Sequence, residues 1–385
     1  MERFIAKRHR SSRMGLSLDT AALARFNDVI DLSIGDTDYV TDPRIIERAF
    51  LDAKAGHTHY GDPKGDPELI AKLTQAWQED WGQVLLESEV MVTASSCLGM
   101  ALVMLSIIDP GDEVIVFSPY FTPYRDQIEL AGGVCVDVET RAEDNYRIRE
   151  EALDAAINSH TKAIIFNNPN NPTGMGYEAQ DLDALLRLAI KHDLLVIADE
   201  IYTTYIYEGR FRPLRTYPGM KERTVTLNSF SKNFLMTGWR IGALMAEPAL
   251  LKVVERVNGS LIYTAPAVSQ RAAIEALTIR DSIREVYISE YKKRVLYAAD
   301  RVEAISYFDL VRPKGTFYLF PDIQKTGMTG PEFCEYALEH AGVLLTPGDV
   351  FGIGGVGHVR MACTVGVERL AEAFDRLELL EDRFS

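Results

Sequence analysis

The sequence lacks any long apolar run, and it has few of the residues that build disulfide frameworks or metal sites. No stretch approaches the ~20 apolar residues that cross a bilayer, and no secretory apolar region opens the chain. The four cysteines, Cys97, Cys135, Cys334 and Cys363, show no CxxC spacing, and the seven histidines form no HxxxH or HExxH pair. We therefore expect a cytoplasmic protein without a membrane partner, a disulfide framework or a metal site.

Positive charge is also scarce. Lysine and arginine total 41 against 56 aspartates and glutamates, which gives a net charge of −15. Nucleic acids and anionic membranes repel such a protein, so we expect neither as a partner. The one basic cluster comprises Arg3, Lys7, Arg8, His9, Arg10 and Arg13. Its apolar content is thin and no cleavage pattern follows, which favours a solvated or partner-packed arm over a transit peptide.

What the sequence does contain, from about residue 65 to 275, is an alternation of short β-branched runs with helical patterns. Pro67–Trp81 and Gln180–His192 carry apolar residues at three- and four-residue spacing, as amphipathic helices do. The strand candidates are Val90–Thr93, Glu113–Phe117, Gly133–Asp137, Ala163–Phe166, Leu194–Ala198, Thr224–Leu227 and Ile241–Met245. This alternation predicts an α/β domain with a mostly parallel, buried, seven-stranded sheet flanked by helices.

After about residue 275 the pattern changes. A charged helical run, Asp281–Ile305, precedes strand-like pieces at Gly315–Phe320 and His358–Cys363, and a final helix begins at about Gly366. We predict a large domain over residues 46–275 and a smaller α+β domain over residues 276–385. Residues 1–45 are too short to fold alone, so we expect them to form an N-terminal arm and part of the small domain.

The strongest chemical signal is the segment Ser229–Lys232, which directly follows a predicted strand and precedes Arg240 by eight residues. A lysine amine forms a Schiff base with an aldehyde cofactor when a dry pocket or a nearby cation lowers its pKa. Two hydroxyls and a guanidinium suit a phosphate group. The competing interpretation is a surface lysine in a serine-rich turn.

Two other predicted strands are also followed by polar residues that could bind such a cofactor. Asp199 follows Leu194–Ala198, where ligands of open α/β sheets bind, and its carboxylate could hold a pyridine nitrogen protonated. A helix-capping aspartate is the alternative. Tyr202 could bond the ring hydroxyl of such a cofactor. Asn171 lies in the turn-rich loop after Ala163–Phe166, from which its amide could reach the same ring oxygen, although the loop alone reads as ordinary turn chemistry.

These three segments, in this order and spacing, resemble the fold-type I pyridoxal-phosphate enzymes, specifically the class I/II aminotransferase family. The resemblance covers nearly the whole chain. Further matching segments are Asp31–Asp36, Tyr60–Gly65, Pro119–Tyr124, Pro347–Gly352 and His358–Met361. It implies an aspartate-aminotransferase-like fold, with pyridoxal 5′-phosphate as the cofactor of the large domain.

The resemblance also implies residue roles around that cofactor. Lys232 would be the Schiff-base lysine and general base, Asp199 the partner of the pyridine nitrogen, and Phe121 the stacking ring. Asn171 and Tyr202 would bind the ring oxygen. The phosphate would be held by Ser96, Cys97, Ser229, Ser231, Arg240 and, from the partner subunit of a homodimer, Tyr60. Gly35, Asn171 and Arg360 would bind the substrate, with Arg360 on its carboxylate.

One segment departs from the family pattern. Where a glycine usually begins the phosphate-binding helix, the chain has Ala94-Ser95-Ser96-Cys97. A helix N-terminus still binds phosphate through its free N–H groups, which keeps Ser96 and Cys97 in the site by their backbone. Some aspartate-specific relatives carry a lysine where Cys97 stands, and that lysine binds the distal carboxylate of the substrate. The absence of this lysine weakens the case for a dicarboxylate substrate.

We therefore expect an aminotransferase that moves an amino group between an L-amino acid and a 2-oxo acid. A non-transaminating enzyme of the same fold, such as a carbon–sulfur β-lyase or an amino-acid oxidase or cyclase, is the alternative, because it would share Lys232, Asp199 and Arg360. A ligand-sensing regulator is disfavoured by the net charge and by the short segment before residue 30. The substrate side chain is not readable, and the candidate lining residues are Ile34, Tyr39, Tyr124 and Tyr263.

Overall fold

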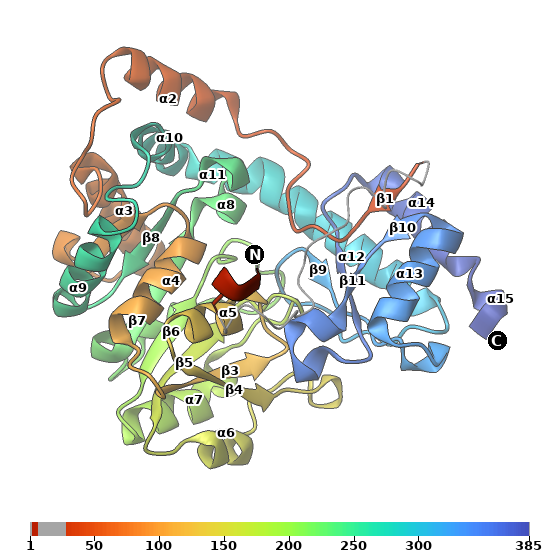
Figure 1. The fold of residues 1–385 in the computed structure, drawn as a ribbon. Helices are drawn as coiled ribbons and strands as arrows, with labels where there is room; N and C mark the ends of the chain where they lie inside the picture. The colour runs from red at the N-terminus through yellow and green to blue at the C-terminus, as the bar shows by residue number, and fades with distance from the viewer. Residues whose placement is uncertain (1, 7–27, 385) are drawn as a thin grey trace.

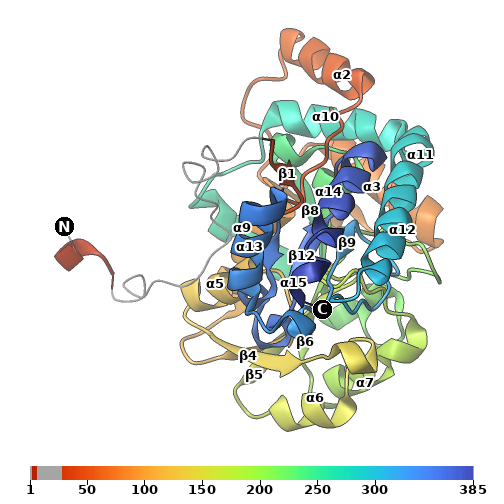
Figure 2. The ribbon, with the colours of Figure 1, turned by 90° about the vertical axis from the view of Figure 1, so that its right-hand side faces the viewer.

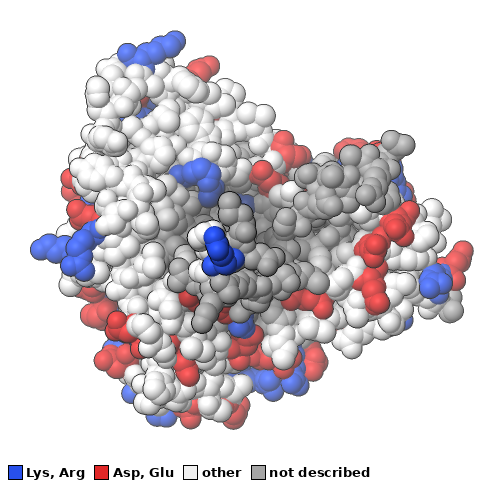
Figure 3. Space-filling model, in the orientation of Figure 1, with Lys and Arg blue, Asp and Glu red and all other residues white. Residues whose placement is uncertain are grey.

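The computed structural model describes residues 2–6 and 28–384. Of the basic cluster, Arg3 falls within this range, whereas Lys7, Arg8, His9, Arg10 and Arg13 lie outside the described residues. In the described ranges no helix is both long and apolar enough to cross a membrane. Charged side chains of both signs are scattered around the face in Figure 3, and on the described part of that face the basic ones form no continuous patch.

The expected seven-stranded, mostly parallel sheet is present, in the order β2-β8-β7-β6-β5-β3-β4 (Figure 1). Only β8 runs antiparallel to its neighbours. The strands are β2 (Val90–Thr93), β3 (Glu113–Ser118), β4 (Val134–Glu139), β5 (Thr161–Asn167), β6 (Leu195–Asp199), β7 (Thr224–Ser229) and β8 (Gly242–Met245). Each predicted strand ends within two residues of the observed one.

Both faces of this sheet are buried under helices, which explains why its strands read as continuous apolar runs. In β3, Val114 and Val116 face one layer, and Ile115 and Phe117 face the other. The first layer consists of α4 (Ser96–Ile107), α5 (Pro123–Leu130) and α9 (Pro248–Gly259), and the second of α6 (Glu150–Ala156) and α7 (Ala179–Lys191). Over the β2–β8 end lie α2 (Pro43–Lys54), α3 (Pro67–Trp81), short α8 (Phe230–Asn233) and α10 (Ala267–Thr278).

The C-terminal part forms a second core beside the sheet (Figures 1 and 2). Its helices are α12 (Ser289–Ala304), α13 (Gly330–Ala341), α14 (Val367–Glu378) and α15 (Glu381–Phe384), whereas α11 (Arg280–Ile283) packs at the β2–β8 end through Ile283. Its strands are β9 (Tyr318–Leu319), β10 (Val343–Leu344), β11 (Thr346–Pro347) and β12 (Val359–Ala362), and β1 (Ile30–Asp31) pairs with β10. The N-terminal segment thus reaches this core, whereas the domain boundaries at residues 45 and 275 remain predictions.

Two C-terminal expectations need correction. The helical run Asp281–Ile305 is not one regular helix, because a π-helical segment, Arg284–Ile288, separates α11 from α12. The strand-like piece Gly315–Phe320 contains only the two-residue strand β9. The reason is that Thr316 has φ +61°, which turns the backbone out of the extended conformation.

The topology gathers the predicted functional segments at one edge of the sheet. β2, β3, β5, β6 and β7 run in the same direction, so their carboxyl ends lie together. The residues that follow these ends are Ser95–Cys97, Pro119–Tyr124, Asn168–Asn171, Glu200–Tyr202 and Phe230–Lys232. Arg240 reaches the same edge from the other direction, because antiparallel β8 begins there at Gly242.

Candidate active site

A cavity of about 610 Å³ opens between this edge and the C-terminal part. Its lining includes seven of the predicted site residues: Gly35, Phe121, Asn171, Asp199, Tyr202, Lys232 and Arg360. An adjoining cavity of about 160 Å³ is lined by Ser96, Cys97, Ser229, Ser231 and Arg240. Phe121, Asp199 and Lys232 line both cavities, so the two form one site with a ring-sized and a phosphate-sized end.

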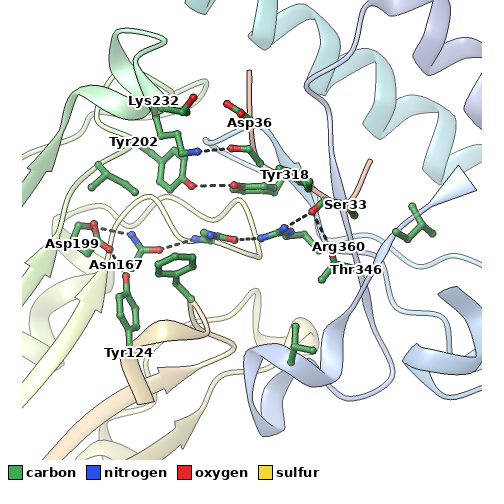
Figure 4. Close-up of a pocket in the computed structure, with 18 of the residues that line it drawn as sticks. Ser33, Asp36, Tyr124, Asn167, Asp199, Tyr202, Lys232, Tyr318, Thr346 and Arg360 are labelled. Atoms are coloured by element: carbon green, nitrogen blue, oxygen red, sulfur yellow. Dashed lines mark hydrogen bonds between the residues drawn. The ribbon is translucent and has the colours of Figure 1, made fainter. Parts of the chain in front are cut away.

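Lys232 stands at the junction of the two cavities. It lies in the single turn α8, directly after β7, and Ser229 caps this turn by accepting a hydrogen bond from Ser231 N at 3.1 Å. Its Nζ donates to the carbonyl oxygen of Gly35 (Figure 4). Burial lowers the pKa of Lys232 to about 8, and the cations Arg360 and Arg240 act in the same direction. About a tenth of the amine is therefore neutral and nucleophilic at pH 7.

Asp199 ends β6 at the floor of the site, with an exposed fraction of 5%. Its Oδ2 accepts a hydrogen bond from the Tyr124 hydroxyl, whereas its buried Oδ1 has no hydrogen-bond partner among the described residues. Burial raises the pKa of Asp199 to about 6, against the effect of the Tyr124 hydrogen bond. A buried carboxylate oxygen without a donor is costly, so the site fits a ligand that brings an N–H group to this oxygen.

This carboxylate gives the unliganded protein a pH dependence of stability. A folded-state pKa of about 6 lies above the unfolded value, so the contribution is fully present below about pH 4 and is lost as the pH rises through 6. We expect the free energy of unfolding of Asp199→Asn, relative to that of wild type, to rise by about 2 kcal/mol between pH 4 and pH 7. Urea unfolding of both cofactor-free proteins at the two pH values measures this, and a constant difference would contradict it.

Arg360 lies in β12 at the opposite side of the cavity and is fully buried. Nη2 donates to Ser33 O at 2.6 Å, and Nη1 donates to Asn171 Oδ1 at 3.1 Å (Figure 4). Its guanidinium lies 4.6 Å from the ring centre of Tyr318 and 4.9 Å from that of Phe351. Within the described ranges it has no ion pair, and its Nε has no hydrogen-bond acceptor. A buried cation in this state fits a small carboxylate ligand.

The phosphate-sized cavity contains the N-terminus of α4, where the sequence departs from the family pattern. Ser95 caps the helix by accepting a hydrogen bond from Leu98 N at 3.2 Å. Its φ of 90° and ψ of 153° belong to a region that is almost exclusive to glycine. Gly242 packs against this turn so closely that a Cβ there would lie 2.6 Å from Ser96 N. The glycine-like geometry is thus kept, and the first N–H groups of α4 remain available to an anion.

Ser95→Gly is accordingly expected to raise the free energy of unfolding by about 1 kcal/mol. Relief of about 1–3 kcal/mol of backbone strain outweighs the flexibility of glycine and the few tenths lost with the cap. Ser95→Ala is the matched control, because it loses the cap while keeping the strained Cβ, and it should destabilise the protein. Urea unfolding compares the three proteins. Equal destabilisation by both variants would show that Ser95 is not strained.

Other predicted residues lie outside the cavities or have neighbours that the sequence did not indicate. Tyr60 is 86% exposed, and its ring centre lies 5.4 Å from that of Tyr263 at the surface. Of the four candidate side-chain contacts, Ile34 and Tyr124 line the larger cavity, whereas Tyr39 packs on the C-terminal core. The bond between Tyr124 and Asp199 could have been suspected, because Tyr124 closes the aromatic segment that follows β3.

Comparison with known proteins identifies the family. The family model for aminotransferase class I and II matches residues 27–377. The aspartate aminotransferase of Pyrococcus abyssi is 36% identical over 92% of both chains. The aromatic-amino-acid aminotransferase 2 of Thermococcus litoralis is 34% identical over 91% of both chains. The solved aspartate aminotransferase of Thermotoga maritima superimposes with a TM-score of 0.92 and 31% identity, covering 98% of this chain and all of that one.

This chain therefore belongs to the class I and II aminotransferases. The expected aspartate-aminotransferase-like fold of type I and the expected aminotransferase function are confirmed. Aminotransferases of this family act on small-molecule amino acids and oxo acids. The relatives differ in the amino acids for which they are named, so the family leaves the substrate side chain of this chain open.

Proposed function

We propose that this chain is a pyridoxal-5′-phosphate-dependent transaminase that moves an amino group between an L-amino acid and a 2-oxo acid. The observation that carries the proposal is the meeting of three reactive groups in one cavity. These are the depressed-pKa amine of Lys232, the Asp199 Oδ1 without a hydrogen-bond donor among the described residues, and the Arg360 guanidinium, which forms no ion pair with any of them. When bound, the cofactor supplies an aldehyde for the amino group and a ring that withdraws electrons from the substrate Cα.

The cofactor ring would be held by residues of the sheet edge. Asp199 Oδ1 would accept a hydrogen bond from the protonated ring nitrogen, which would supply the donor that this oxygen lacks among the described residues. Phe121 would stack on the ring, and Tyr202 would donate to the ring oxygen. Asn171 would donate to the same oxygen through Nδ2, because its Oδ1 is already committed to Arg360.

The phosphate would be held at the smaller cavity. The backbone N–H groups of Ser96 and Cys97, the hydroxyls of Ser229 and Ser231, and the Arg240 guanidinium surround that space. Arg240 donates to Thr237 O at 2.8 Å, and it forms no ion pair with a carboxylate of the described residues. An anion at this position would therefore meet both a helix N-terminus and a free cation.

Arg360 and Lys232 would then act on the substrate. Arg360 would bind its α-carboxylate through Nε and the nearby Nη edge, with Gly35 and Asn171 beside it. This anchor fixes the orientation of the Cα–H bond relative to the cofactor ring. The Lys232 amine would take the proton from Cα and return it to the other side of the new double bond, as a general base near neutral pKa does.

We further propose a homodimer of the cytoplasm in which Tyr60 reaches the phosphate of the partner subunit. Tyr60 lines neither cavity of its own chain and is 86% exposed, its ring lies against that of the half-exposed Tyr263, and Leu261 nearby in the sequence is also half-exposed. Exposed aromatic and aliphatic groups of this kind fit an interface better than solvent. Sedimentation analysis of wild type and of a Tyr60→Ser, Leu261→Ser double variant tests the assembly.

The reaction is tested with a panel of ¹⁵N-labelled L-amino acids, each mixed with unlabelled 2-oxoglutarate, added cofactor and the purified protein. Transamination places the label in newly formed glutamate and leaves the oxo acid of the donor. A carbon–sulfur lyase would instead release the label as ammonia together with pyruvate, and an oxidase would consume oxygen. Label that appears only in ammonia would overturn transamination while leaving the cofactor assignment in place.

A further inference from the structure

Tyr318 contacts two of the predicted site residues, Tyr202 and Arg360. It lies in β9 with an exposed fraction of 2%. Its hydroxyl is 3.1 Å from the hydroxyl of Tyr202, and the Arg360 guanidinium carbon lies over its ring, 4.6 Å from the ring centre (Figure 4). A Cβ built on Gly35 would lie 1.8 Å from the same hydroxyl, so the backbone of Gly35 closes over it.

We propose that Tyr318 is a positioning residue that directs the proton of the Tyr202 hydroxyl toward the cofactor and holds the Arg360 guanidinium for the substrate. The inference rests on the proposed function, because it assigns the cofactor ring oxygen to Tyr202 and the substrate carboxylate to Arg360. Tyr318 would thus couple the cofactor contact of Tyr202 to the substrate contact of Arg360, because its side chain touches both residues.

The direction of the hydrogen bond between the two tyrosines follows from their surroundings. Only one of two facing hydroxyls can donate, and a Tyr202 that donates to Tyr318 would turn its proton away from the ring oxygen. Gly35 blocks the other side of the Tyr318 hydroxyl, and Tyr202 is its hydrogen-bonding neighbour among the described residues. Tyr318 therefore donates, and the proton of Tyr202 is free for the ligand.

The charges around the pair favour the same direction. The charged groups that face the two hydroxyls are Arg360, Asp36 and Asp199. Burial raises the pKa of both tyrosines, and Arg360 opposes this effect at both, but it is the Tyr318 ring over which its guanidinium lies. The better donor of the two is thus Tyr318.

The second contact restrains the arginine. The guanidinium carbon lies 4.6 Å from the centre of the Tyr318 ring and 4.9 Å from the centre of the Phe351 ring. Two cation–π contacts of this kind favour one position of the guanidinium. Its Nε, which lacks an acceptor among the described residues, stays available to a ligand.

Tyr318→Phe removes the hydroxyl and keeps the ring, so it tests the hydrogen bond to Tyr202 apart from the contact with Arg360. A donor to the cofactor ring oxygen stabilises the form that has lost a proton, so it holds down the pH midpoint of the visible absorbance of the bound cofactor. We expect Tyr318→Phe to raise this midpoint by about half a unit to one unit. Tyr307→Phe is the matched control, because it removes a buried hydroxyl bonded to Leu377 O at 2.7 Å, far from the cavity, and it should leave the midpoint unchanged.

A double-mutant cycle shows whether the effect passes through Tyr202. Tyr202→Phe alone should raise the midpoint, and adding Tyr318→Phe to it should raise it no further. Tyr318→Leu also removes the ring, and we expect it to increase the KM for the amino acid about tenfold over Tyr318→Phe. Should Tyr318→Leu fail to fold, the cycle of phenylalanine variants alone decides the matter.

A midpoint in Tyr318→Phe within about 0.2 unit of wild type would overturn the proposal, and so would an additive shift in the double variant. Both results presuppose that the wild-type protein develops a visible band when pyridoxal 5′-phosphate is added. A wild-type protein without any such band would instead contradict the proposed function, so the two failures are distinct.

Discussion

Replacing Lys232 with alanine is expected to lower the rate of amino transfer on the order of 10⁴-fold. Among the described residues Lys232 is the one lysine that lines the cavity, and its amine both captures the aldehyde and moves the Cα proton in our account. Asp199 and Arg360 would not take over this role, because in our account the ring nitrogen and the substrate carboxylate would occupy them. Turnover is measured by the labelled-nitrogen assay with the best donor of the panel.

The same variant should still bind pyridoxal 5′-phosphate noncovalently. The proposed phosphate and ring contacts come from α4, α8, the ends of β6 and β7, and the segments that follow β3, β5 and β6 or precede β8, and none of them uses the lysine side chain. Lys252→Ala is the control, because it removes an exposed lysine of α9 and should keep the wild-type rate. A Lys232→Ala rate within tenfold of wild type would overturn the role of Lys232.

Asp199→Ala is expected to reduce turnover on the order of 10³-fold while the protein keeps its fold. In our account its carboxylate would keep the ring nitrogen of the bound cofactor protonated, and a ring without that proton withdraws electrons from the substrate less well. Loss of the side chain also frees the Tyr124 hydroxyl from its acceptor. The measurement is the single-turnover rate with one amino acid and no oxo acid, which reports the chemical step alone.

Asp199→Glu serves as the matched variant for this test. It keeps a carboxylate at the floor of the cavity and should recover part of the lost rate, because the charge rather than the exact reach supplies the effect. If Asp199→Glu and Asp199→Ala are equally slow, position matters more than charge. If Asp199→Ala turns over at the wild-type rate, Asp199 does not hold the ring nitrogen.

The large domain was predictable because its strands are buried on both faces. Runs such as Val114–Phe117 then carry an unbroken apolar signal, and the residues after each run mark the edge where ligands bind. Lys232, Asp199 and Asn171 were assigned for that reason, and the structure brings them into one cavity. Their roles as cofactor and catalytic residues remain proposals.

The C-terminal part was harder to predict, because two-residue strands and turns leave no period to detect. The alternation across Gly315–Phe320 gives no hint that Thr316 turns the backbone and aims Tyr318 at Tyr202. Backbone acceptors are equally invisible in a sequence: the carbonyl oxygen of Ser33 accepts from Arg360, and the carbonyl oxygen of Gly35 accepts from Lys232. At Ser95 the sequence indicated a difference that the backbone does not show. The serine adopts a glycine-like conformation, so the turn before α4 forms without a glycine.

The central claim is that the Lys232 amine bonds the cofactor aldehyde, and reductive trapping tests it most directly. The protein is loaded with pyridoxal 5′-phosphate, reduced with borohydride, digested and mapped by mass spectrometry. Our account predicts the phosphopyridoxyl group on the peptide that contains Lys232, and its loss when an amino-acid donor is added before reduction. A label on another lysine, or none at all, would contradict it.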